Sequence, residues 1–233
     1  MTATFYRRPL PEPLLALDSP EGRSLFAEAL GGGFLESYFP LAEQFQTQAE
    51  PSFCGLTSLV VVLNSLAVDP GRLWKGPWRW FGEEMLDCCV PLDEVRARGL
   101  TLDEFACLAR CNGASSALRR PSREGGGVDA LRAAIVASAT DRAAPRVVVS
   151  YARRALEQTG EGHFSPVAGY HPGRDLALVL DVARFKYPPH WVSVEALHRA
   201  TTLVDPATGR SRGWVLLSAA PRPTALGLTL GCC

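Results

Sequence analysis

The chain changes character near Pro145, and this division limits the possible folds more than any other feature of the sequence. Before it, apolar residues recur at helical spacing. After it come four segments rich in β-branched and apolar residues, RVVVSYAR, HFSPVAGY, LALVLDVARF and GWVLLSA. A short helix, SVEALHRATTL with Ser193 as its N-cap, separates the last two. A helical first half and a sheet-rich second half predict an α+β fold, with a site between the two lobes of one domain.

Local signals divide the chain further. Ser19-Pro20 begins a helix that the glycines at 31–33 end, and Thr101 with Glu104 forms a capping box for a second helix. We expect an N-terminal arm over 1–18 and one domain over 19–220, with a helical lobe at about 19–140 and a sheet lobe at about 145–220. Residues 221–233 are expected to form a C-terminal tail.

Composition excludes several classes of protein. A hydrophobic content of 47% and a charged content of 21% are typical of a globular domain, and the net charge of zero gives no electrostatic reason to bind nucleic acid or an acidic membrane. No run approaches the roughly 20 apolar residues that span a bilayer. The proline-interrupted start lacks the apolar core of an export signal, so we expect a cytoplasmic protein.

Seven cysteines are present, and an odd number without an export signal favours reduced thiols over a disulfide framework. Cys54 stands apart from the others, because it opens an apolar helix over LTSLVVVLNSLAV. A helix N-terminus offers partial positive charge and free N–H groups, and both favour a thiolate. Cys54 is therefore a candidate nucleophile.

A hairpin in the second half supplies partners for this thiol. Its turn lies near Pro172, and either of two registers places His163 and Asp181 on one face of the sheet, directly opposed or one diagonal step apart. A carboxylate there would hold the imidazole in one tautomer while its other nitrogen faces the thiol. The competing histidines, at positions 171, 190 and 198, lack an equally placed acid; the first is expected to be solvated in the turn.

Gln48, six residues before Cys54, could join the Cys54 backbone N–H as an oxyanion donor. Each of these signals alone has a structural explanation: a core cysteine, a structural histidine, an aspartate that caps a turn. Together they favour cysteine nucleophile chemistry.

At these residues the chain resembles the phytochelatin synthases, a papain-like family of γ-glutamylcysteine transpeptidases. The similar blocks are FQTQAEPSFCGLTSLVVVLNSLAVDPGRLWKGPWRWF, EMLDCC and TGEGHFSPVAGYHPGRDLALVLDVARFKYPPHW, within residues 35–217. The resemblance implies a papain-like α+β fold, in which the helical lobe carries the nucleophile and packs on an antiparallel sheet. It places the catalytic triad at Cys54, His163 and Asp181 and the oxyanion glutamine at Gln48. It implies substrate-binding roles for Arg184, which would hold a substrate carboxylate, and for Asp205, Gly162, Lys186 and Tyr187.

The resemblance implies formation of phytochelatins from glutathione through a Cys54 thioester with release of glycine, and so a role in heavy-metal detoxification. No organic cofactor is expected; cadmium, zinc or copper would activate mainly as a complex with substrate thiolates. Glutathione, phytochelatin oligomers and heavy-metal ions are the expected partners, and a homodimer is possible within the family. Plant members carry a further cysteine-rich domain, whereas this sequence ends at Cys233; its long eukaryotic-type blocks nevertheless favour transpeptidation over hydrolysis.

Two alternatives stay open. One is a hydrolase that removes glycine from glutathione or its S-conjugates. The other is a thiol-rich metal buffer without turnover, for which Cys88, Cys89, Cys107 and Cys111 are weak candidate ligands. No CxxC pair is present, so a tetrahedral zinc site is poorly supported, and packing in the core is favoured for Cys107. The tryptophans at 74, 78 and 80 are expected to pack between the lobes.

Overall fold

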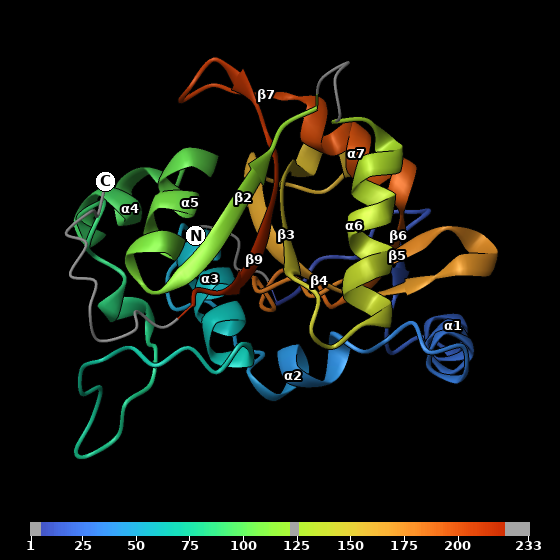
Figure 1. Cartoon of the computed structure of the whole chain (residues 1–233). Helices are drawn as coiled ribbons and strands as arrows, with labels where there is room; N and C mark the ends of the chain where they lie inside the picture. Colours follow the sequence, from blue (N-terminus) through green and yellow to red (C-terminus); the bar gives the residue numbers. More distant parts are fainter. Residues whose placement is uncertain (1–5, 122–125, 222–233) are drawn as a thin grey trace.

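A seven-stranded antiparallel sheet forms the centre of the computed structural model, which describes residues 6–121 and 126–221 (Figure 1). The strand order is β1-β6-β5-β4-β3-β9-β2, and β7 and β8 form a separate small hairpin. The strands are β1 Leu15–Ala16, β2 Ala114–Arg119, β3 Arg146–Ala152, β4 Gly162–His171, β5 Leu176–Val179, β6 His190–Ser193, β7 Val204–Asp205, β8 Arg210–Ser211 and β9 Gly213–Ala219. The α-helices are α1 Pro20–Gly31, α2 Tyr38–Glu43, α3 Cys54–Ser65, α4 Leu92–Arg98, α5 Leu102–Cys111, α6 Val128–Thr140 and α7 Val194–Thr202; short 3-10 turns are η1 Glu83–Met85, η2 Arg153–Leu156 and η3 Pro172–Arg174.

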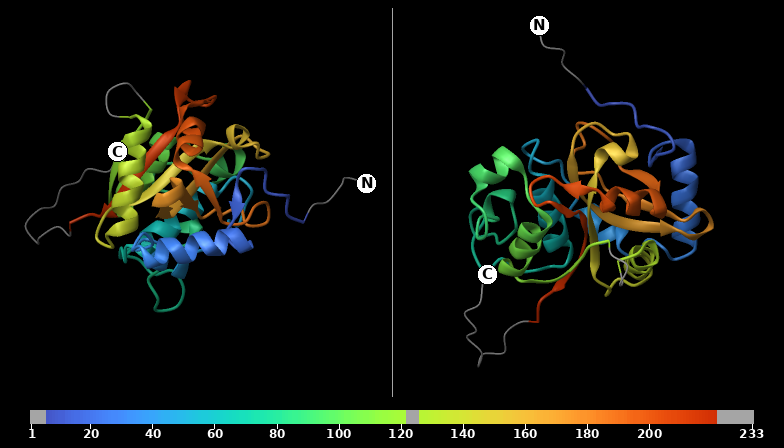
Figure 2. Two further views of the ribbon diagram at one scale, coloured as in Figure 1. Left: turned by 90° about the vertical axis from the view of Figure 1, so that its right-hand side faces the viewer. Right: turned by 90° about the horizontal axis from the view of Figure 1, so that it is seen from above.

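Helices cover both faces of this sheet. Strand β3 is mostly apolar and fully buried, as expected for a central strand, and its apolar residues alternate between two cores. Val148 faces the core that contains α1, α3 and α5, whereas Val147 and Val149 face the core formed with α6 and α7. Figure 2 shows α1 and the α4–α5 pair at opposite ends of the molecule. The sheet is therefore the middle of three layers.

Helix α3 lies in the interior and carries Cys54 at its first position. Eleven of its twelve residues are buried, because its sequence is apolar on nearly every side. Its N-terminal turn packs closely on the segment before α5: a Cβ at Gly55 would lie 2.9 Å from Leu100. The helix packs on β4, so the core itself fixes the position of Cys54 relative to that strand.

The α+β fold class predicted from the sequence is confirmed, as are the main helix signals. Ser19 caps α1, the Thr101–Glu104 capping box is formed at α5, and Ser193 accepts a hydrogen bond from the Ala196 N–H at 3.1 Å. Strand β2 was not predicted, since it lies in the helical half of the sequence and gains its partner only through β9. The end of the predicted tail, residues 222–233, lies outside the described residues.

The prediction that three tryptophans pack between the lobes is wrong. Trp74, Trp78 and Trp80 are 36%, 70% and 42% exposed, on a loop between α3 and η1 that projects from the body of the molecule (Figure 1). An isolated bridge between Lys75 and Trp78 closes the tip of this loop. The glycine and proline residues of this loop turn the chain back, so the tryptophan rings do not reach the core.

Within the described segments, none of the helices combines the length and the apolar character needed to cross a membrane.

Candidate active site

The structure places Cys54 where helix α3 meets strand β4. Its side chain is 8% exposed, and it is the free cysteine among the described residues. The thiol is therefore largely desolvated, but it borders a cavity and is reachable from that side. Its neighbours on the sheet side are His163 and Phe164 of β4. The sequence thus positions the thiol by placing it at the first residue of a buried helix.

His163 and Asp181 approach each other across the β4–β5 hairpin as predicted. His163 Nε2 lies 2.8 Å from Asp181 Oδ1, and both side chains are almost completely buried. The register pairs Val167 with Val179, and the hydrogen bond from Leu180 N to Pro166 O continues it beyond β5. Asp181 is therefore one diagonal step from His163, which is the second of the two registers expected.

The charges of the site favour an ionised thiol. Burial by itself would raise the pKa of Cys54, but the His163 imidazole, a hydrogen bond from the Phe164 backbone and Arg153 together lower it below the ordinary value of a thiol. Burial and Arg153 work against a charged His163, but Asp181 and the Cys54 thiolate outweigh them and raise its pKa. Both shifts favour a thiolate–imidazolium pair, with the carboxylate of Asp181 on the far side of the ring.

Arg153 is a buried partner of Asp181 that the sequence analysis missed. Its Nη1 lies 2.9 Å from Asp181 Oδ2, its Nη2 donates to Oδ1 at 3.0 Å, and the side chain is 3% exposed. Burial raises the pKa of Asp181, but His163 and Arg153 overcome it and hold that pKa far below its usual range. The signal was present in the segment RVVVSYAR, whose last arginine lies two residues beyond Tyr151, the residue paired with His163.

A cavity of about 300 Å³ opens beside Cys54 and contains one buried cation. Arg212 is 6% exposed and faces Asp205, whose carboxylate oxygen lies 3.6 Å from Nη2. Its Nε has no hydrogen-bond partner among the described residues. Gly162 leaves room for this guanidinium, because a Cβ there would lie 2.1 Å from Arg212 Nη1. The other lining residues include Arg98, Thr101 and Glu161.

Arg212 was not predicted, whereas Asp205 and Gly162 were, and all three line this cavity. The hairpin register explains the omission. Asp205 pairs with Arg210 across β7–β8, and Arg212 follows β8, where its backbone N–H donates to Leu203 O at 3.1 Å. Recognising the turn DPATG as the tip of a hairpin would have indicated an arginine beside Asp205.

Gln48 is buried near the site, but its amide does not line the cavity. Its Nε2 donates to the Glu50 and Pro51 carbonyls, both at 2.8 Å, so both N–H groups are engaged. Its Oε1 is buried without a hydrogen-bond partner among the described residues. The Gln48 backbone N–H donates to Val182 O at 3.1 Å and ties this loop to the segment that carries Asp181. An oxyanion role would require the side-chain amide to rotate.

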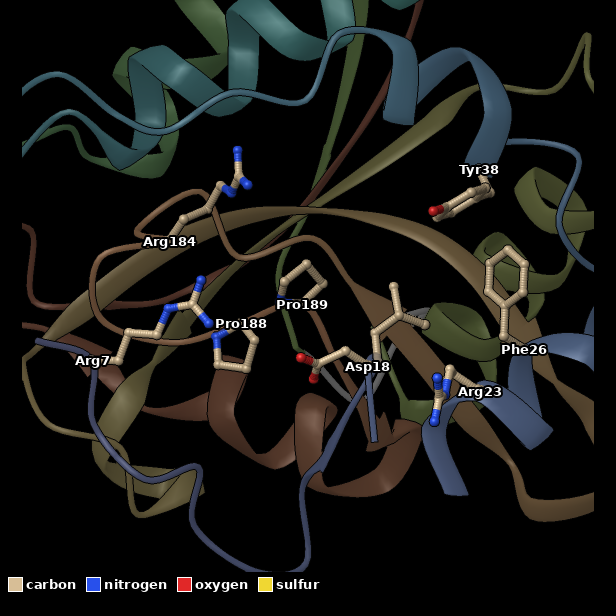
Figure 3. A pocket seen from close by; sticks show the side chains of 9 residues that line it. Arg7, Asp18, Arg23, Phe26, Tyr38, Arg184, Pro188 and Pro189 are labelled. Carbon is tan, nitrogen blue, oxygen red and sulfur yellow. The ribbon is translucent and has the colours of Figure 1, made fainter. Parts of the chain in front are cut away.

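Three other residues predicted to bind substrate lie outside the Cys54 cavity. Arg184 is exposed, stacks over the Phe45 ring at 5.1 Å and lines a separate cavity (Figure 3). Lys186 is half-buried near Gly160, and burial lowers its pKa. Tyr187 is 1% exposed and its hydroxyl accepts the Thr159 N–H at 2.9 Å. Arg212, and not Arg184, lines the cavity that contains Cys54.

The remaining histidines have structural surroundings. His171 is buried rather than solvated, because its Nδ1 accepts the Arg174 N–H at 3.2 Å and its Nε2 lies 3.1 Å from Glu28. His190 is fully buried, and burial lowers its pKa. His198 Nε2 lies 3.0 Å from the Gly126 carbonyl.

Four cysteines lie together at the side of α5, and the expectation of reduced thiols there is not met. Cys88 is bonded to Cys111 and Cys89 to Cys107, with Cα–Cα distances of 6.6 and 6.4 Å. The reason is geometric: Cys107 and Cys111 share a face of α5, and the adjacent Cys88 and Cys89 each find one of them. The ligand atoms of Cys88, Cys89 and Cys111 lie within 4.8 Å of one another, so these positions could also hold a metal ion.

A thiol, an imidazole and a buried carboxylate beside a cavity form the arrangement found in cysteine-nucleophile enzymes. The family model described as "Phytochelatin synthase" matches residues 5–214. The chain belongs to the phytochelatin synthase family.

Relatives from plants and yeast are similar over nearly the whole chain. A glutathione gamma-glutamylcysteinyltransferase 3 from Lotus japonicus is 48% identical over 99% of this chain and 48% of its own length. A glutathione gamma-glutamylcysteinyltransferase 1 from Triticum aestivum is 50% identical over 99% of this chain and 46% of its own length. The glutathione gamma-glutamylcysteinyltransferase of Schizosaccharomyces pombe is 45% identical, over 98% of this chain and 54% of its own length. The chain thus spans about half the length of the curated relatives it matches.

Among solved structures, a double glycine motif protease from an AMS/PCAT transporter, in complex with a leader peptide, is similar with a TM-score of 0.43 and 18% identity. The similarity covers 76% of this chain and 90% of that one.

Proposed function

We propose that the chain transfers the γ-glutamylcysteinyl group of glutathione to an amine, and that the acyl group is carried on Cys54. The observation that carries this proposal is the buried line Cys54–His163–Asp181 beside a cavity with an anion-binding guanidinium. The names of the relatives from Lotus japonicus and Triticum aestivum support the choice of donor and group.

The cavity offers complementary charges to the amino-acid end of a γ-glutamyl group. That end carries an α-carboxylate and an α-ammonium on one carbon. Arg212 would hold the carboxylate, since a buried guanidinium with an unused Nε–H is suited to bind it through two oxygens. Asp205, beside Arg212, would accept the ammonium. This assignment transfers the carboxylate-binding role from Arg184 to Arg212.

In the first step, the Cys54 thiolate attacks the carbonyl carbon of the Cys–Gly peptide bond. The electron pair of the broken C–N bond stays on the glycine nitrogen, and His163 donates the proton that lets glycine depart as an amine. The product is a γ-glutamylcysteinyl thioester on Cys54. Asp181 stabilises the imidazolium before this transfer and fixes the tautomer after it, because Nε2 faces the carboxylate and Nδ1 is left toward the thiol.

In the second step, His163 accepts a proton from the attacking group. If the attacking group is the α-amine of another glutathione, the product is one γ-Glu-Cys unit longer. If it is water, the products are γ-glutamylcysteine and free enzyme, which is the hydrolase alternative. The oxyanion of both steps would be held by the Cys54 backbone N–H and by the Gln48 amide, once that amide has turned from the Glu50 and Pro51 carbonyls.

Heavy-metal ions would enter as part of the substrate. A soft ion such as cadmium masks the glutathione thiols and leaves the acceptor amine to react. The cluster of Cys88, Cys89 and Cys111 offers a second place for such an ion when these cysteines are reduced, because thiolates at these separations suit soft metals. Activation by metal through the substrate predicts turnover that survives loss of this cluster.

One experiment tests the reaction and separates the alternatives. The protein is incubated with glutathione, with and without cadmium, and products are identified by mass spectrometry. Oligomers that disappear in Cys54→Ser and Asp181→Asn support transfer, whereas glycine and γ-glutamylcysteine alone indicate hydrolysis. Cadmium binding without turnover, kept in Cys54→Ser and lost with the four clustered cysteines, indicates a metal buffer.

The binding assignment has its own control. Arg212→Gln is expected to raise KM for glutathione about tenfold or more, whereas Arg184→Gln is expected to change it less than about twofold. A larger rise in KM for Arg184→Gln than for Arg212→Gln would assign the substrate carboxylate to Arg184 instead.

A further inference from the structure

A second and larger cavity, of about 550 Å³, lies apart from the one that contains Cys54. Its wall comes from four separate segments: the N-terminal arm, helix α1, helix α2 and the stretch that follows Asp181. None of its lining residues is shared with the Cys54 cavity. The lining residues are Arg7, Leu17, Asp18, Arg23, Phe26, Tyr38, Arg184, Pro188 and Pro189.

Three arginines line this cavity without a carboxylate partner among the described residues. Arg7, Arg23 and Arg184 form no ion pair within the described residues, although most exposed arginines of α4, α6 and α7 do. Arg7 and Arg184 make only ring contacts, with Tyr6 and Phe45. The cavity therefore has an excess of positive charge over its single acid, Asp18.

The charged groups lie at the two ends of an apolar floor. Figure 3 shows Arg7 and Arg184 on one side and Arg23, Phe26 and Tyr38 on the other, with Asp18 and the prolines between them. Phe26 and Tyr38 contact each other edge to face at 4.7 Å, so the aromatic end is fixed. An elongated ligand could reach both cationic ends and lie along the prolines.

We propose that this cavity binds a short acidic peptide that carries two carboxylates, a free amine and an apolar side chain. The two carboxylates would pair with the cationic ends, the amine would face Asp18, and the apolar group would pack on Phe26 and Tyr38. This ligand class follows from the charges and rings of the cavity and does not depend on the reaction proposed at Cys54.

Through Arg184, a ligand in this cavity would be linked to the loop that precedes Cys54. Arg184 stacks on Phe45, and three residues later the Gln48 N–H donates to Val182 O. The stretch after Asp181 and the loop before Cys54 are thus joined at two points. Occupancy of the cavity would favour one position of Arg184 and so of this loop.

The dipeptide aspartyl-phenylalanine has each of the proposed groups and serves as the probe. Its binding is measured by titration calorimetry on the full chain with Cys54→Ser, which removes the thiol. We expect Arg7→Gln and Arg23→Gln each to weaken binding about tenfold, as does esterification of the phenylalanine carboxylate. Glutathione, which has the same charges without an apolar side chain, should bind more weakly than the probe.

Two further variants make the result decisive. Arg142→Gln removes an exposed arginine outside the cavity and should leave the affinity unchanged. Arg212→Gln alters the Cys54 cavity and should also leave it unchanged. Arg7→Lys and Arg23→Lys keep the charge and should recover part of the affinity. Binding that is absent at millimolar probe, that is insensitive to Arg7→Gln and Arg23→Gln, or that is lost in Arg212→Gln would overturn the proposal.

Discussion

Replacement of Arg153 by methionine tests how the buried carboxylate of the site is held. In the wild type, Asp181 Oδ2 lies against the Arg153 guanidinium. Asp181 Oδ1 is hydrogen-bonded to the His163 imidazole and also accepts the Ala183 N–H at 2.9 Å. Methionine keeps the unbranched stem of the side chain but leaves Oδ2 buried without a cation. Removal of one partner from a buried ion pair costs about 3–5 kcal/mol of stability. For a chain of 233 residues, this corresponds to a fall in Tm of about 6–20 °C.

The measurement is urea denaturation followed by circular dichroism, together with thermal melts at the same pH. Arg199→Met is the matched control, because it breaks the Arg199–Glu195 pair on α7, whose side chains are 63% and 71% exposed. An exposed pair of this spacing contributes no more than about 0.5 kcal/mol. The two variants remove the same atoms, so the difference between them reports burial.

A second variant separates lost charge balance from lost packing. In Arg153→Met combined with Asp181→Asn, the orphaned negative charge is gone, while the amide oxygen can still accept the Ala183 N–H. We expect this double variant to be more stable than Arg153→Met alone, since the two changes touch the same contact and do not add. A cost below about 1 kcal/mol for Arg153→Met, or a double variant less stable than either single one, would refute the reasoning.

Three further outcomes follow from the site. The rate of Cys54 alkylation by iodoacetamide, measured against pH, should have its inflection below the pKa of a free thiol. His163→Ala should move that inflection to higher pH, and an unchanged profile would contradict the thiolate–imidazolium pair. Burial raises the pKa of Glu83, so its stabilising contribution is present below its unfolded pKa and is lost as pH rises through the raised one. The stability of Glu83→Gln relative to wild type, from urea curves, should therefore increase as pH rises from the ordinary carboxyl range through the raised pKa, and a constant difference would contradict the buried, protonated carboxyl. Gly162→Ala places a Cβ 2.1 Å from Arg212 Nη1, so KM for glutathione should rise about tenfold, and a kinetic assay that finds no change would exclude Arg212 as the carboxylate site.

The sequence was sufficient to locate the Cys54–His163–Asp181 line because each member depends on local structure. A helix start positions Cys54, and one hairpin positions the other two. The two registers expected for this hairpin differ by a shift of two residues, so both leave His163 and Asp181 on the same face. Side chains along a strand alternate with a period of two, so a shift of two residues preserves the face, whereas a shift of one residue would have moved one of the two side chains to the opposite face.

The groups that the sequence missed depend on contacts between distant segments. Arg153 meets Asp181 across 28 residues, and Arg212 reaches the cavity only after β7 and β8 have paired. Arg184 lies three residues after Asp181, yet its side chain faces the other cavity, beside Phe45. A similarity between sequences can suggest that such a residue is functional, but the direction of its side chain comes from tertiary packing.

The place of β9 within the sheet has a consequence for the order of folding. This strand lies between β3 and β2, pairing Val215 with Val148 on one side and Leu216 with Ala117 on the other. Strand β2 is synthesised about a hundred residues before β9, so until β9 is made β2 lacks its partner and β3 has one unpaired edge. Pairings of such long range are slow to form, and open edges attract other chains. The nascent chain therefore depends on protection from aggregation until β9 emerges. A fragment that ends before β9 should fail to fold even though it contains Cys54, His163 and Asp181.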